Sequence, residues 1–252
     1  MRIPAVLREV AAGCLAGILV GIVVGGLGSR LAMRVSAMAA GPIPQGATTD
    51  NGAIVGEITL GGTIALIVFG GVFAGLQGGL LYAALRPWLL PFGRWRGLVF
   101  GFGLLGLDGS LILDDTNSDF IILRPPLLNV AMFAALFPIF SLALAPVFDR
   151  VLRFLDGGSF AAGALTIFAL LLAALFLGLG LVSGFTSLGS DPSPVDLVGL
   201  LSLLLIAAGL ALRIPKPTAA APPWAPASYV VLAAAVLVAA ARTYSSVARI
   251  LS

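Results

Sequence analysis

The chain has 252 residues, of which 60% are hydrophobic and only 10% are charged, and its mean hydropathy is +1.12. No soluble domain with a solvated surface has this composition, so lipid is the solvent for most of the chain. A net charge of +3, scattered between apolar runs, argues against nucleic acid as a partner, and the lack of histidine excludes His-ligated haem, His-ligated zinc and His-based catalysis.

The first apolar stretch, residues 10–29, carries glycines at four-residue intervals: Gly13, Gly17, Gly21 and Gly25. The second stretch, residues 60–85, repeats this spacing at Gly71, Gly75 and Gly79. Residues four apart share one face of a helix, and in lipid a strip of small residues lets two helices approach closely. We therefore expect two membrane helices that pack through their glycine faces.

The first helix continues to Arg30 and Arg34, which are four residues apart and share one face. Counted from residue 10, Arg30 comes about 30 Å along the helix, near the outer headgroups. Paired arginines suit phosphate or carboxylate groups through forked hydrogen bonds. The alternative is pairing within the protein, with Glu57, Asp108 or the acidic loop that follows Asp108.

Asp108 lies in the third apolar stretch, residues 97–113. If this helix enters the membrane near Gly97, Asp108 is about 16 Å deep, close to the middle. A carboxylate at that depth costs about 2.5–3.5 kcal/mol on insertion scales unless it is protonated or paired. Two interpretations stay open: an ion, proton or ligand site, and a structural ion pair, for which Arg30 is the nearest candidate by depth.

The next loop, residues 113–124, is acidic and ends at Arg124, a further candidate for ligand or ion-pair contacts. Its oxygen donors are Asp114, Asp115, Asn117 and Asp119. Three of them have the spacing that opens a calcium loop, but Phe120 stands where an EF-hand needs glycine, which excludes that motif. A divalent cation bound at the surface and a solvated acidic turn both stay open, and no other cofactor is indicated.

Four more apolar stretches follow, at residues 127–148, 160–183, 195–213 and 228–248. With the three stretches described above, they make seven spans of about 20 residues, the length that crosses the hydrocarbon core. With the N-terminus inside, the inner segments hold most of the 14 basic residues: Arg2, Arg8, Arg86, Arg94, Arg96, Arg150, Arg153, Arg213 and Lys216. The positive-inside rule thus favours an inner N-terminus and an outer C-terminus.

The sequence therefore predicts one all-α, polytopic membrane domain over residues 1–252. Its predicted parts are a glycine-packed three-helix core at 1–113, three further spans at 114–213, a proline-rich linker at 214–227 and a last span at 228–252. The segment from Gly28 to Arg34, Gly-Ser-Arg-Leu-Ala-Met-Arg, together with the acidic loop, resembles uncharacterised multi-pass membrane proteins of high-GC bacteria. The resemblance covers roughly spans one to four and implies a bacterial plasma membrane but no activity.

Three function classes fit these features. The leading expectation is a non-enzymatic accessory or assembly subunit that binds a membrane protein, a second copy of itself, a lipid or a pigment through its glycine faces and outer charged patch. The first alternative is a small transporter or ion-coupled carrier that uses Asp108. The second is a metal-dependent lipid-modifying enzyme that uses the loop aspartates with Arg30 and Arg34, although no nucleophile–base pair supports it.

Overall fold

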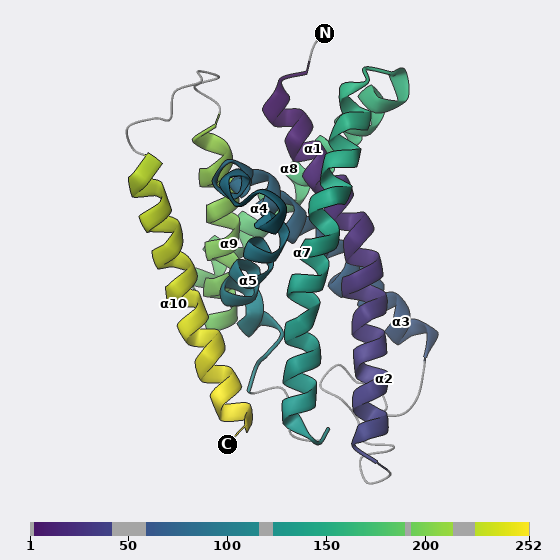
Figure 1. The fold of residues 1–252 in the computed structure, drawn as a ribbon, viewed down its shortest axis with the longest axis vertical. Coiled ribbons are helices and arrows are strands. Elements are labelled where there is room, and N and C mark those ends of the chain that lie inside the picture. Colours follow the sequence, from purple (N-terminus) through teal and green to yellow (C-terminus); the bar gives the residue numbers. More distant parts are fainter. Residues whose placement is uncertain (1–2, 42–58, 116–122, 190–192, 214–224, 252) are drawn as a thin grey trace.

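The computed structural model describes residues 3–41, 59–115, 123–189, 193–213 and 225–251 (Figure 1). Helices joined by turns make up these ranges, and no strand occurs in them, which confirms the predicted all-α class. Within the same ranges, five stretches are long and apolar enough to cross a membrane: Ala5–Ala39, Leu60–Leu111, Pro126–Asp156, Phe160–Leu188 and Leu232–Leu251. Asp196–Ala211 is a shorter apolar helix.

Two of these stretches contain a π-helical segment. The first consists of α1 (Ala5–Val20), the π-helix η1 (Gly21–Gly28) and α2 (Ser29–Ala39). The second begins with α3 (Leu60–Leu66), the π-helix η2 (Ile67–Phe73) and α4 (Ala74–Leu89). The two π-helical segments pack against each other. π-Helices are rare and usually a single turn long, so a packed pair is an unusual local structure.

The second stretch folds back on itself at Gly93. This residue lies in the 3₁₀ segment η3 (Leu90–Trp95) and has φ 53°, a left-handed conformation that glycine adopts without steric cost. The chain continues as α5 (Arg96–Asp108) and the short η4 (Gly109–Leu111). α4 and α5 therefore form a hairpin, and Tyr82 of α4 packs edge-on against Phe100 of α5 at 5.1 Å.

The remaining helices are α7 (Pro126–Asp156), α8 (Phe160–Leu188), α9 (Pro194–Ala211) and α10 (Ala225–Leu251). The starts of α7, α8 and α9 are encoded locally: proline occupies the first turn of α7 and α9, and the hydroxyls of Ser159 and Ser193 cap α8 and α9. Figure 1 shows the start of α1 and the end of α10 at opposite ends of the bundle.

The glycines of the first helix lie directly against those of the second. A Cβ atom added to Gly17 would lie 2.9 Å from the Cα of Gly79, and one added to Gly21 would lie 2.7 Å from the Cα of Gly75. We call this contact the glycine seam; it comprises Gly13, Gly17, Gly21 and Gly25 on one side and Gly70, Gly71, Gly75 and Gly79 on the other. Backbone touches backbone along the seam, so it has no room for a side chain.

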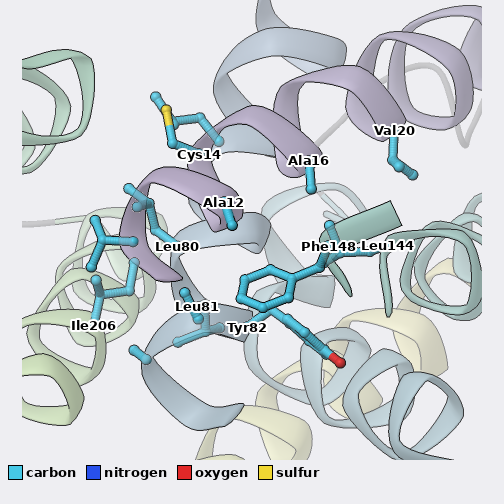
Figure 2. Close-up of a cluster of buried hydrophobic side chains, with 14 of the residues drawn as sticks. Ala12, Cys14, Ala16, Val20, Leu80, Leu81, Tyr82, Leu144, Phe148 and Ile206 are labelled. Atoms are coloured by element: carbon cyan, nitrogen blue, oxygen red, sulfur yellow. The ribbon is translucent and has the colours of Figure 1, made fainter. Parts of the chain in front are cut away.

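A layer of buried hydrophobic side chains, which we call the Tyr82 layer, fills the interior of the bundle (Figure 2). Tyr82 is fully buried between Phe100 and Phe148, and its ring meets that of Phe148 edge-on at 5.2 Å. Leu144 of α7 and Ile206 of α9 are also fully buried in this cluster. The core is therefore shared by α7 and α9 as well as by α1, α4 and α5.

Candidate functional site

Asp108 is the last residue of α5, and its side chain points into the bundle, where it is 7% exposed. Two neutral side chains donate hydrogen bonds to its carboxylate. Gln77 of α4 donates from Nε2 to Oδ2 at 3.2 Å, and the Ser202 hydroxyl of α9 donates to Oδ1. The hairpin at Gly93 brings Gln77 to the level of Asp108, and α9 packs against α4 to supply Ser202.

No ion pair involves Asp108 within the part of the chain that the structure describes. The depth argument proposed Arg30 as its partner, and the structure replaces that pair with the contacts to Gln77 and Ser202. Arg30 is half-buried near the start of α2. Depth gives the position of a residue along its helix axis. It does not give the direction in which the side chain points, so it does not identify the neighbouring side chain.

A cavity of about 150 Å³ opens beside the Asp108 carboxylate. Its polar lining consists of Asp108, Gln77 and Ser29. The rest is apolar or backbone: Gly21, Gly25, Gly70, Ala74, Gly75, Leu104, Leu111, Ile112, Leu136, Phe137 and Phe140. Gly21, Gly25 and Gly70 of the two π-helical segments form part of the cavity wall. The cavity is large enough for a few water molecules or a small ligand.

The predicted outer patch is only partly described. Arg34 and Arg124 are exposed, while Glu57, Asn117 and Asp119 lie outside the described residues. Asp114 is half-buried and has an interaction partner. The structure therefore places the two arginines on the surface without testing the proposed cation site as a whole.

The carboxylate of Asp115 accepts a forked pair of hydrogen bonds from Arg249 near the end of α10. Nε lies 2.6 Å from Oδ2, and Nη2 lies 3.0 Å from Oδ1. The hydrogen bonds from this guanidinium hold the pKa of Asp115 below its usual 3.8. Among the described residues, no three side chains of the Asp, Glu, Cys or His type gather closely enough to hold a metal.

An ion-pair layer at the end of the bundle near the start of α1 was not foreseen from the sequence. Glu9 accepts hydrogen bonds from Arg86, at 3.0 Å, and from Arg213. Arg213 also donates to the Ala83 carbonyl at 2.7 Å, so one carboxylate ties α1 to α4 and α9. Two further pairs, Arg96 with Asp149 and Arg8 with Asp156, join α5 and α1 to α7. The alternation of charge and apolar runs predicts these residues at one end, but not their pairing.

The Asp108 site joins a carboxylate, two neutral donors and an apolar cavity inside the bundle. Each oxygen of the Asp108 carboxylate accepts one hydrogen bond from a neutral donor. Each oxygen can therefore still accept a second hydrogen bond or bind a cation. The sequence does not single out Gln77 or Ser202; the signal for each is a polar residue within a mostly apolar helix. Comparisons of the chain with protein-family models, curated proteins and solved structures find no match.

Proposed function

We propose that this protein is a seven-span carrier of a bacterial plasma membrane that binds a proton or a small monovalent cation on Asp108. The observation that carries the proposal is a buried carboxylate that lines a cavity and, within the described residues, accepts hydrogen bonds only from neutral groups. Intramembrane carboxylates that face a cavity typically belong to ion or proton pathways.

The depth of the site supports this assignment. Asp108 follows the start of α5 at Arg96 by 12 residues, and Gln77 precedes the end of α4 at Leu89 by the same number. At about 1.5 Å per residue, both side chains lie about 18 Å from the Gly93 turn. Since the hydrocarbon core is about 30 Å thick, a turn at the membrane surface puts both polar groups near the bilayer midplane.

The wall of the cavity supports a binding role as well. Gly21, Gly25 and Gly70 belong to the two π-helical segments and contribute no side chain to the space. π-Helical turns are rare and are frequent at functional sites. The backbone beside the buried charge is therefore irregular, and irregular backbone at membrane depth is tolerated where it is buried in protein or lines a cavity.

The ion-pair layer supports an inner N-terminus and an outer C-terminus. Arg8, Arg86, Arg96 and Arg213 gather at one end of the bundle, and clusters of basic residues favour the cytoplasmic side. In a Cys14→Ser background, a membrane-impermeant maleimide should label Arg124→Cys in intact cells.

The companion variant Trp95→Cys lies in the Gly93 turn, where the side chain is 55% exposed. It should be labelled only after the membrane is permeabilised. Labelling of Trp95→Cys in intact cells contradicts the seven-span topology with an inner N-terminus.

Substitution of Asp108 tests the carrier function. Asp108→Asn removes the charge but keeps the shape, so the protein in liposomes should lose ion-dependent flux, measured with an internal pH or cation dye. Removing a buried charge also removes its insertion cost, so the melting temperature should stay level or rise.

Asp156→Asn is the matched control, because this carboxylate is 48% exposed and pairs with Arg8 at the end of the bundle. It should leave the flux unchanged. Normal flux in Asp108→Asn, or the same loss in both variants, rejects the carrier proposal.

An accessory or assembly role is the second candidate. It is favoured by the long apolar surface of α8, where Leu171 is 67% and Leu179 is 63% exposed, which suits a partner helix as well as lipid. The glycine seam is used within the chain, so a partner would dock on α8 instead. Purification in mild detergent tests this role: a membrane protein held at fixed stoichiometry, and lost in Leu171→Arg, supports it.

A further inference from the structure

A second cavity, a groove of about 520 Å³, lies between the Gly93 turn and α7. We call it the turn groove. Its polar lining is Arg94, Arg96 and Asp149, and its apolar lining includes Leu142, Ala145 and Pro146. It shares no lining residue with the Asp108 cavity. The groove occupies the end of the bundle that also holds the ion-pair layer, since Arg96 and Asp149 form one of those pairs.

The charges of the turn groove favour an anion. Arg96 and Asp149 neutralise each other, whereas Arg94 has no carboxylate partner among the described residues and lies over the Trp95 ring at 5.1 Å. Two guanidiniums and one carboxylate leave the lining with one excess positive charge. Because Gly93 breaks the preceding helix, α5 starts here, and the positive end of its dipole adds to the same field.

The apolar side of the groove favours a lipid over a soluble anion. Leu142 is 49% exposed, and Phe92 and Trp95 beside the groove are 46% and 55% exposed. Aromatic side chains of this kind settle at the interface between headgroups and hydrocarbon. A ligand that satisfies both sides has an anionic head and an apolar tail.

We propose that the turn groove binds the phosphate of an anionic phospholipid, with Arg94 on the phosphate and Leu142 against an acyl chain. Basic pockets between membrane helices bind such headgroups, and a guanidinium offers a forked set of donors to phosphate oxygens. The proposal concerns a site independent of Asp108. It therefore stands whether or not the protein is a carrier.

Lipid titration followed by native mass spectrometry tests the site on the full-length protein in neutral detergent. Phosphatidylglycerol should bind more tightly than phosphatidylcholine with the same acyl chains. Arg94→Gln removes a charge-assisted contact and should weaken the first phosphatidylglycerol by about tenfold. Arg153→Gln is the control: it removes an equal charge from an exposed position on α7 outside the groove and should change binding less than about twofold.

Three further measurements make the outcome decisive. Arg94→Lys keeps the charge and should keep the preference for phosphatidylglycerol. Both Arg94 variants should have the melting temperature of the wild type. Glycerol 3-phosphate supplies the head without the tail and should not compete at the same concentration. Equal affinity for the two lipids, an equal loss in Arg153→Gln, or full competition by glycerol 3-phosphate overturns the proposal.

Discussion

Alanine at Gly17 should separate the two helices of the glycine seam. The new Cβ would lie 2.9 Å from the Cα of Gly79 and would also overlap the carbonyl oxygen of Gly75. Carbon atoms pack at about 3.5–4.0 Å, so the backbones must part by about 1 Å. Inserting a methyl into a packed contact costs about 1–3 kcal/mol. Since both neighbours are backbone atoms, no rotamer change relieves the overlap.

Gly178→Ala provides the matched control. Gly178 is an exposed residue in the interior of α8, and a Cβ added there meets nothing within 4 Å. Both substitutions gain the same helix propensity, so the difference between them isolates the packing term. At roughly 2–4 °C per kcal/mol, Gly17→Ala should melt about 2–12 °C below Gly178→Ala. Tryptophan fluorescence in detergent reports the melt; equal melting temperatures, or a higher one for Gly17→Ala, refute the seam as a close backbone contact.

Two further predictions concern the charged ends of the bundle. Glu9→Gln leaves two arginines without their carboxylate at a site where the Glu9 side chain is only 13% exposed, so it should lower the free energy of unfolding by about 2–4 kcal/mol. In the same chemical denaturation series, Asp156→Asn should cost less than about 1 kcal/mol, and similar losses would contradict a special role for Glu9. Arg249 lowers the pKa of Asp115, so the stabilisation by this pair is present above the unfolded value of 3.8 and is lost as the pH falls through the lower folded value. The melting temperatures of wild type and Asp115→Asn should therefore differ at pH 6 and converge at acid pH, and a gap that persists at low pH would show that the difference is not electrostatic.

The hydropathy of the chain and the spacing of its glycines are local properties, and they were enough to predict the class of fold and the approximate helices. The first expected span, residues 10–29, lies within a helix that runs from Ala5 to Ala39. The ends of the observed helix differ from those of the expected span because arginines and small polar residues extend the helix beyond its apolar run. The caps at Ser159 and Ser193 are equally local, because each serine side chain accepts a hydrogen bond from a backbone N–H only three residues later.

Contacts between distant segments were decided only by the tertiary structure. Asp108 meets Gln77 31 positions earlier and Ser202 94 positions later, and Glu9 meets Arg213 across 204 positions. From the sequence, Asp108 is expected near mid-membrane and stands out as a costly charge, because rise per residue and hydrophobicity depend on the helix alone. Which neighbours share that depth depends on how each helix is rotated about its axis and which helix lies beside it. Those two quantities are set by packing along the glycine seam and the Tyr82 layer, so no single segment of the sequence carries them.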